Sequence, residues 1–308
     1  MAFTAKDVQA LREKTGVGMM DCKKALVEAD GDMDKAVDLL REKGLATAAK
    51  KADRVAAEGA VVAYNDTEKK IGAIVELNCE TDFVGKNPEF VELAKKIAKT
   101  VAEQNPADLD ALNAATIADG SLTVAESIQE LFLKIRENMN LRRFVRVDGV
   151  VSTYIHAGNS VAVMVEFETD DATAAKPEFV AMGKDVAMQI AAMNPAYLDE
   201  ASVPAEVVEK EKAINLAQLN EDPKNANKPE QVKTKIIEGK IKKYFTEVCL
   251  LNQAFVKDGD YSVGSYVAKV AKDLGADIKV KGFTRYGKGE GIEKKVDNFA
   301  EEIANMVK

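Results

Sequence analysis

Hydrophobic residues in the first part of the chain recur at helical spacing, interrupted by turn residues. A capping-box-like start at Thr4 predicts a first helix, which the glycine-containing stretch 15–18 ends. Two further apolar stripes follow, and the last is expected to end at Gly44, a residue favoured in left-handed helix caps. The pattern predicts a three-helix module over residues 1–44, followed by an alanine- and lysine-rich helical linker over 45–57.

From residue 58 the pattern changes to strands alternating with helices, and it occurs twice. Four blocks of the first copy recur in the same order in the second, at offsets of 88 to 90 residues. The matching blocks are 58–64 with 148–154, 73–76 with 163–166, 80–82 with 168–170, and 88–91 with 177–180. They indicate two homologous units of a hairpin, a turn and a helix, which predicts an α+β fold with a duplicated core. The first unit is expected over 58–146, and the second over 147–203 and 246–286.

Two further helical patterns, at 204–219 and 229–245, are separated by turn residues. They predict a helical hairpin over 204–245 that projects from the second unit. Packing against its own return helix explains its apolar face most simply, and self-association of two hairpins is the alternative. A last strand is expected near 278–286, and residues 287–308 are predicted to form a glycine-rich turn and a C-terminal helix.

The composition is that of an ordinary folded protein, with 46% hydrophobic and 31% charged residues among 308. The longest apolar runs are five residues, far below the roughly 18 that a membrane span needs, and the N-terminus resembles neither a signal nor a transit sequence. A net charge of −8 and a pI near 5.1 disfavour nonspecific nucleic-acid binding. We therefore expect a cytoplasmic protein whose partner is another protein, without membrane or direct nucleic-acid contact.

Catalytic and metal-binding patterns are not found in the sequence. The three cysteines are widely spaced, His156 is the single histidine, and neither zinc-ligand nor nucleophile-and-base spacing occurs. The glycine-rich stretches at 16–18 and 287–291 match neither the dinucleotide fingerprint nor the P-loop. We expect no cofactor, no metal and no enzymatic activity.

One stretch, NCETDFVGKN at 78–87, places an aromatic residue in a predicted exposed turn. If Glu80-Thr81-Asp82 matches Glu168-Thr169-Asp170 in the second copy, then Asp171 stands where the first copy has Phe83. Helix capping would explain the shared residues, whereas Phe83 would belong to the first copy alone. From these residues, core packing and partner contact remain equally open for Phe83.

Three more residues are candidates for contact with a partner. One of two adjacent helical residues generally points outward, so Met19 or Met20 is a candidate, with core packing as the alternative. His156 is expected at the tip of the second unit's hairpin, where partner contact and an idle loop residue are equally supported.

Four motifs together resemble the elongation factor Ts family. They are TGVGMMDCKKAL at 15–26, NCETDFV at 78–84, EVVEKE at 206–211 and GEGIEK at 289–294, in the family's order over essentially the whole chain. The resemblance implies a guanine nucleotide exchange factor for elongation factor Tu in its GDP-bound and nucleotide-free forms. It also implies an N-terminal module of the ubiquitin-associated type, a two-part core, a coiled-coil hairpin and a C-terminal helix.

The resemblance further implies site residues. In this family the segment that matches Thr81, Asp82, Phe83 and Val84 dislodges magnesium from the partner's nucleotide site. The N-terminal module and the C-terminal helix contact the partner's G domain, which makes Met19, Met20 and Lys23 secondary contacts.

His156 matches a family histidine that faces the partner's distal domain, although Asn159 and Ser160 depart from the family pattern beside it.

A homodimer through the hairpin is a further possible association. The competing hypothesis is a non-catalytic adaptor that binds a small partner through residues 1–44, and the difference between the copies at Phe83 argues against it.

Overall fold

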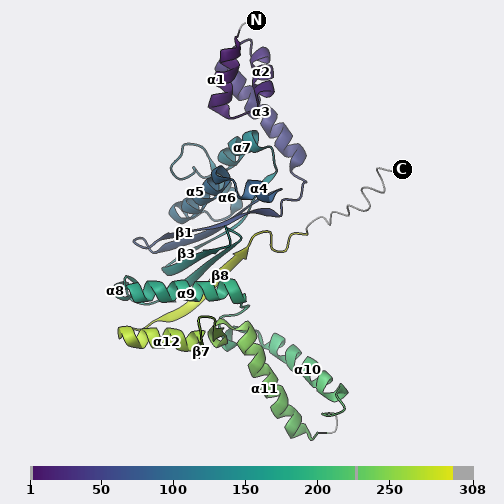
Figure 1. The fold of residues 1–308 in the computed structure, drawn as a ribbon, viewed down its shortest axis with the longest axis vertical. Helices are drawn as coiled ribbons and strands as arrows, with labels where there is room; N and C mark the ends of the chain where they lie inside the picture. The colour runs from purple at the N-terminus through teal and green to yellow at the C-terminus, as the bar shows by residue number, and fades with distance from the viewer. Residues whose placement is uncertain (1–2, 226–227, 294–308) are drawn as a thin grey trace, which may run out of the picture.

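Two three-stranded antiparallel sheets form the centre of the molecule (Figure 1). The computed structural model describes residues 3–225 and 228–293. The first sheet has the order β1-β2-β3 and the second the order β4-β5-β8. Their strands are β1 (Glu58–Asp66), β2 (Ile71–Cys79), β3 (Met139–Asp148), β4 (Val150–His156), β5 (Val161–Glu168) and β8 (Lys279–Gly287). The predicted α+β class is confirmed.

Each sheet has one face against helices and the other against the opposite sheet, because successive strand residues point to opposite faces. The first sheet packs against α5 (Pro88–Gln104), α6 (Leu109–Ala114) and α7 (Val124–Ile135). The second packs against α9 (Pro177–Met193) and α12 (Val263–Leu274). Between the sheets, Val61 and Ile74 meet Val151, Ala162 and Met164. The layers therefore run helices, sheet, sheet, helices (Figure 1).

The two copies expected from the sequence fold alike. Each hairpin leads into a four-residue helix, α4 (Asp82–Gly85) or α8 (Asp171–Ala174), and then into the long helix α5 or α9. Both long helices end at an asparagine in the left-handed region, Asn105 and Asn194. The third strands come from elsewhere: β3 follows α7, and β8 is supplied by the end of the chain.

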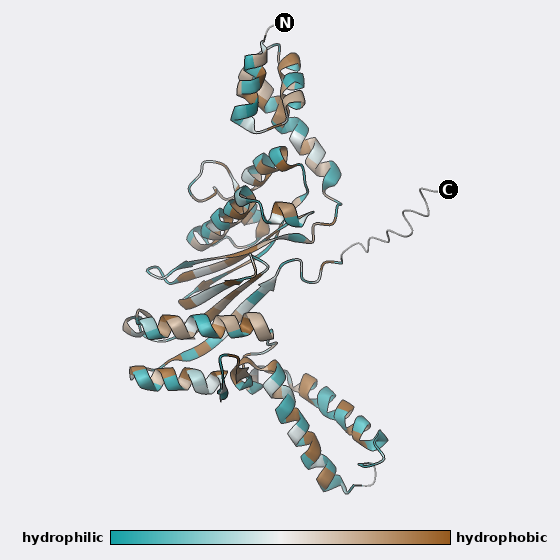
Figure 2. Ribbon diagram, viewed as in Figure 1, coloured by the Kyte–Doolittle hydropathy of each residue, from teal (hydrophilic) through white to brown (hydrophobic). Residues whose placement is uncertain are grey.

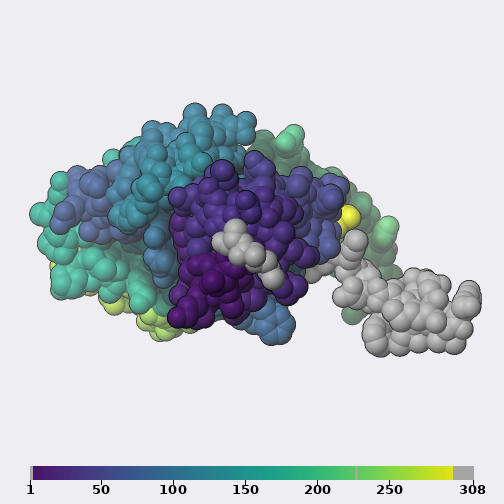
Figure 3. Space-filling view, turned by 90° about the horizontal axis from the view of Figure 1, so that it is seen from above, coloured from purple at the N-terminus to yellow at the C-terminus, as the bar shows by residue number. Residues whose placement is uncertain are grey.

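Helices α1 (Ala5–Thr15), α2 (Met19–Glu28) and α3 (Met33–Lys51) lie at one end of the molecule (Figure 1), the end that faces the viewer in Figure 3. They enclose a small core to which Leu133 of α7 also contributes. The prediction that the third helix ends at Gly44 is wrong, because α3 continues to Lys51. Gly44 is buried, and a Cβ atom there would lie 2.0 Å from Cδ2 of Leu133. Glycine at this position therefore permits the close approach of α3 to α7 and does not end the helix.

Helices α10 (Ala205–Glu221) and α11 (Glu230–Val248) form the expected hairpin, which projects from the end of the molecule opposite to α1–α3 (Figure 1). Along both helices, the buried residues are Leu219, Lys233 and Ile241. Apolar residues such as Ile214 and Val232 stay exposed, and both helices carry brown segments in Figure 2. The hairpin thus covers little of its own apolar surface.

Short elements complete the second unit. They are the 3-10 turns η1 (Glu200–Ser202) and η2 (Leu250–Asn252) and the small pair β6 (Ala254–Phe255) and β7 (Asp258–Ser262). The strand predicted near 278–286 is β8, while the predicted C-terminal helix falls mainly on residues 294–308, outside the described residues. In the part of the chain that the structure describes, no helix is sufficiently long and apolar to cross a membrane.

Candidate functional site

Phe83 projects from α4 with 83% of its surface exposed. The next residue, Val84, is buried in the core of the first unit. We call residues 81–85 the Phe83 turn. A large aromatic side chain in water beside a buried neighbour shows that the turn is anchored from one side and open on the other.

Thr81 anchors the start of this turn. Its hydroxyl donates to Oε1 of Glu137 at 2.7 Å, and its backbone N–H donates to Oε2 of the same carboxylate at 3.0 Å. The Thr81 hydroxyl oxygen also accepts from the N–H of Val84 at 3.4 Å, as a helix N-cap does. One carboxylate from outside the turn therefore fixes both its side chain and its backbone.

Two glycines fix the other side of the turn. A Cβ atom on Gly85 would lie 2.7 Å from the carbonyl oxygen of Gly59, so the turn rests directly on the first residues of β1. Gly59 has a φ of +131°, and a Cβ there would lie 2.2 Å from the carbonyl oxygen of Leu77. Larger side chains at either position would displace the turn.

Asp82 is the charged neighbour of Phe83. Nζ of Lys86 donates to its Oδ2 at 2.6 Å. This hydrogen bond is the main cause that holds the pKa of Asp82 below its ordinary value, and the charges of Lys86 and Lys288 act in the same direction. The carboxylate is therefore ionised at neutral pH, next to the exposed ring.

The second copy corrects the residue match made from the sequence. Helix α8 has Asp170 as its N-cap, which accepts from the N–H of Thr173 at 2.9 Å. Asp170 thus takes the place of Thr81, and the residue that corresponds to Phe83 is Ala172, not Asp171. The cap follows Glu76 by five positions in the first copy and follows Glu166, the matching strand residue, by four positions in the second. Ala172 is exposed, so the conclusion that the large side chain belongs to the first copy alone remains.

Met19, Met20 and Lys23 lie on α2, and all three are exposed, the methionines by 42% and 63%. Asp21, between them, accepts from the Arg136 guanidinium at 2.7 Å. Arg136 directly precedes the Glu137 that holds the Phe83 turn. Helix α2, which carries the exposed methionines, is thus joined to that turn through two consecutive residues.

His156 is the last residue of β4 and is exposed. Its Nδ1 lies 3.1 Å from the hydroxyl of Tyr154. The loop after it lies beside β1, because the N–H of Val61 donates to the carbonyl of Asn159 at 2.9 Å. The structure therefore gathers Thr81 to Val84 in one turn and places Met19, Met20, Lys23 and His156 on separate elements.

Comparison with known proteins decides the family. A family model described as Elongation factor TS matches residues 80–290. Elongation factor Ts of Clostridium perfringens (strain 13 / Type A) is 52% identical over 308 residues, which cover 99% of each chain. Elongation factor Ts of Clostridium botulinum (strain Langeland / NCTC 10281 / Type F) is 50% identical over 312 residues, covering 99% of this chain and 98% of the relative. The chain belongs to the elongation factor Ts family.

Membership in the elongation factor Ts family gives the chain a role in translation elongation. The matched residues include the whole Phe83 turn and His156. Helices α1 to α3 precede the match to the family model, but the similarity to the clostridial elongation factor Ts chains extends over them. Within residues 3–225 and 228–293, no group of three or more His, Cys, Asp or Glu side chains could hold a metal ion.

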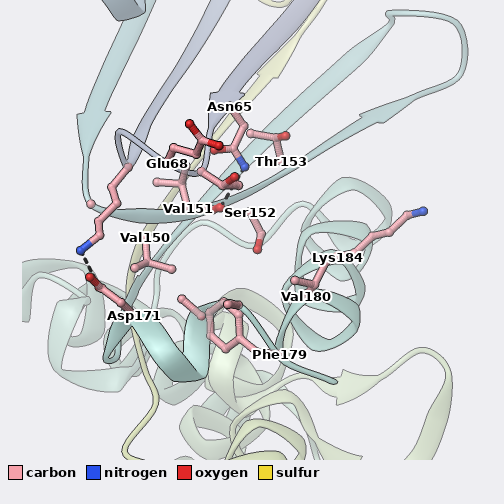
Figure 4. Close-up of a pocket in the computed structure, with 15 residues that line it drawn as sticks. Asn65, Glu68, Val150, Val151, Ser152, Thr153, Asp171, Phe179, Val180 and Lys184 are labelled. Atoms are coloured by element: carbon pink, nitrogen blue, oxygen red, sulfur yellow. Dashed lines mark hydrogen bonds and ion pairs between the residues drawn. The ribbon is translucent and has the colours of Figure 1, made fainter. Parts of the chain in front are cut away.

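Sequence reasoning did not find a hollow of about 680 Å³ on this elongation factor Ts chain. It lies between the start of β4, the β1–β2 loop and helices α8 and α9, and Val150, Phe179 and Val180 give it an apolar side (Figure 4). An ion pair between Lys70 and Asp171 lies at one edge (Figure 4). The hollow lies at the end of β4 opposite to His156, and its residues come from both copies, so no single motif points to it.

Proposed function

We propose that this chain is a guanine nucleotide exchange factor, which binds elongation factor Tu in the cytoplasm and promotes the exchange of GDP for GTP. The observation that carries the proposal is the exposed Phe83 on an anchored turn, beside the ionised Asp82. Thr81, Asp82, Phe83 and Val84 would enter the partner near its nucleotide site and dislodge the magnesium ion. Family membership supports the partner, because the relatives bear the name Elongation factor Ts.

The mechanism needs no reacting group on this chain. Phosphate and Mg²⁺ hold the switch loops of a GTPase. A side chain that enters only the conformation with a poor metal site stabilises that conformation, and so weakens nucleotide binding. By thermodynamic linkage, bound nucleotide weakens the binding of the exchange factor by the same factor.

The free energy gained by burying one phenylalanine side chain indicates that Phe83 does not act alone. Burying one Phe side chain contributes about 2 kcal/mol, which is roughly 30-fold in affinity. The anchored turn limits the entropy lost on binding, since its backbone is already ordered. We propose that Met19, Met20, Lys23 and His156 supply the remaining contacts, each from an exposed position.

The test is the release of labelled GDP from elongation factor Tu. The full chain should accelerate release, and the Asp82→Ala, Phe83→Ala double variant should lose most of the acceleration. Val256→Ala, which shortens another exposed apolar residue on a different surface, is the control and should act like wild type. Undiminished release with the double variant would exclude the Phe83 turn as the acting element. No acceleration by wild type would overturn the function, and binding without release would favour the adaptor hypothesis.

The incompletely covered hairpin supports a second, separate proposal, that two copies associate through α10 and α11. Ile214, Leu216 and Val232 are exposed there. Sedimentation equilibrium of the full chain and of an Ile214→Gln, Val232→Gln variant tests it. A dimer that persists in the variant, or a wild-type monomer, would contradict it.

A further inference from the structure

Glu76 is a carboxylate of β2 with none of its surface exposed. Burying a charge is costly unless it is paired and hydrogen-bonded. Arg142 donates to it at 3.1 Å, Arg143 at 2.5 Å, Asn78 Nδ2 at 3.1 Å, and the backbone N–H of Gly289 at 2.7 Å. Three of these donors come from the first sheet, and the fourth comes from the far end of the chain.

A β-bulge explains how two consecutive arginines reach one carboxylate. In the β2–β3 ladder Glu76 is opposite Arg143 and Leu77 is opposite Leu141, so Arg142 is an extra residue. Consecutive strand residues normally point to opposite faces, whereas a bulge sets two residues against one on the partner strand. Both guanidinium groups therefore lie beside Glu76.

The same arginines bind the backbone after β8. We call residues 287–291 the tail loop. Arg142 donates to the carbonyl of Glu290 at 2.6 Å, and Arg143 donates to the carbonyl of Gly287 at 3.2 Å. Gly289 has a φ of +66°, and a Cβ atom there would lie 2.1 Å from the carbonyl oxygen of Ala57. The N–H of Lys288 also donates to the carbonyl of Ser160 at 2.8 Å. With the bond from Gly289 to Glu76, the tail loop is thus fixed by four hydrogen bonds to its backbone and by a contact that only glycine permits.

The tail loop and the Phe83 turn contact the same short piece of backbone, residues 57–59. From the tail side, Gly289 lies against Ala57, and Nζ of Lys288 pairs with Glu58 at 2.5 Å. Asn78, which donates to Glu76, also donates to the carbonyl of Glu58 at 3.0 Å. From the other side, Gly85 of the Phe83 turn lies against Gly59. A shift of the tail loop would therefore move the surface on which the Phe83 turn rests.

The second copy provides an internal comparison. Glu166 corresponds to Glu76, and the β5–β8 ladder has a bulge at the same place. There the extra residue is Lys281, which pairs with Glu166 at 2.5 Å, and Gly282 stands where the first copy has Arg143. The Glu166 side chain is 25% exposed, against none for Glu76. The carboxylate and the bulge are common to both copies. The tail loop also bonds the second copy, through the N–H of Lys288 and the carbonyl of Ser160 at 2.8 Å, but the carboxylate that accepts from it is Glu76 of the first copy.

We propose that Glu76 is a positioning residue that couples the tail loop to the Phe83 turn. The tail loop thereby fixes the orientation in which Phe83 meets the partner. The proposal rests on the exchange function proposed above. It assigns to the glycine-rich stretch 287–291 a role that sequence motifs did not supply.

The test uses three variants of the full chain. Glu76→Gln removes the charge and keeps the shape. Gly289→Ala disturbs the tail loop from the other side and leaves the Glu76–arginine pairs in place, so it covers the outcome in which Glu76→Gln fails to fold. Glu166→Gln is the matched control, since it alters the same position of the second copy.

Two measurements test the coupling between the tail loop and the Phe83 turn. Hydrogen exchange followed by mass spectrometry should show faster exchange in segments 80–87 and 285–291 of Glu76→Gln and Gly289→Ala, with α9 unchanged. The maximal rate of GDP release from elongation factor Tu should fall by about threefold to thirtyfold in both variants, with a smaller change in the concentration for half-maximal rate. Glu166→Gln should behave as wild type in both measurements.

The outcomes separate this inference from the function on which it rests. The coupling would be overturned if hydrogen exchange in segment 80–87 were as slow in Glu76→Gln and Gly289→Ala as in wild type. It would also be overturned if both variants released GDP from elongation factor Tu at the rate of Glu166→Gln. If wild type itself does not release GDP, the proposed function fails, and the hydrogen-exchange comparison still decides whether the tail loop orders the Phe83 turn.

Discussion

Glu137 holds the hydroxyl and the backbone N–H of Thr81 with its two carboxylate oxygens, at 2.7 and 3.0 Å. The contact ties the residue before α4 to the segment between α7 and β3. Phe83 needs such an anchor because its own side chain has little contact with the fold. The order of the Phe83 turn therefore depends on polar contacts made two residues before the ring.

Thr81→Val should lower the free energy of unfolding by about 1–2 kcal/mol, because it removes a hydrogen bond to a charged group and a helix cap. Urea denaturation measures the change. Thr169→Val is the control. The Thr169 hydroxyl is buried without a hydrogen-bond partner in the described structure, so its replacement should change stability by less than about 0.5 kcal/mol. Equal losses in the two variants would contradict the anchoring role of Thr81.

Phe83→Ala should leave the free energy of unfolding within about 0.5 kcal/mol of wild type, because the ring is 83% exposed. Phe90→Ala is the matched comparison, since it removes a fully buried ring from α5 and should cost about 3–5 kcal/mol. Thermal and urea unfolding of both variants test the contrast. A large loss for Phe83→Ala would mean that the ring packs in the fold and is not offered to a partner.

Gly44→Ala should destabilise the junction of α3 and α7 by about 1–3 kcal/mol, because the added methyl would overlap Leu133. The gain in helix propensity, about 1 kcal/mol, offsets part of this loss. Gly239→Ala is the control, since that glycine lies within α11 with nothing near its Cβ position, and it should stabilise the chain. In a double-mutant cycle with Leu133→Ala, the two losses should be less than additive; additive losses would contradict the overlap.

Stability should fall as pH rises above the ordinary thiol pKa of 9.0. Burial raises the pKa of Cys79 to about 12 and that of Cys249 to about 11. Between the ordinary and the raised values the unfolded chain loses the thiol protons while the folded chain keeps them, so rising pH favours the unfolded state. Urea unfolding at about pH 8 and about pH 10.5 should show a smaller fall for Cys79→Ala, Cys249→Ala than for wild type. Equal falls would show that the thiols do not contribute.

Strong periodicity makes the duplicated part of the fold predictable. In residues 58–104 and 147–193 the strand and helix periods are clear, and the hairpins and helices follow them. Strand β3 is harder to predict because the bulge at Arg142 interrupts the alternation, and Arg143 points toward a buried carboxylate where the pattern calls for an apolar residue. The role of such a residue depends on Glu76, which is distant in the sequence.

The errors have a common cause, since one residue type can serve two purposes. Gly44 has the sequence context of a helix cap, and only the position of Leu133 reveals that it permits a close approach. Likewise Thr81 and Asp170 both cap a short helix, so matching the letters Glu-Thr-Asp displaces the second copy by one residue. The sequence leaves the exposure of Phe83 open because an aromatic residue in a turn can face either way.

The position of Gly289 also bears on how the chain folds during its synthesis. A ribosome completes both partner arginines of Glu76 by residue 143, but the N–H of Gly289 follows only 146 residues later, 289 against 143. The first unit therefore leaves the ribosome with its most buried charge still lacking one hydrogen bond. Its final form requires residues up to Gly289, so a product truncated before this residue would contain the Phe83 turn and its Glu137 anchor without the tail-loop contacts that we propose orient the turn.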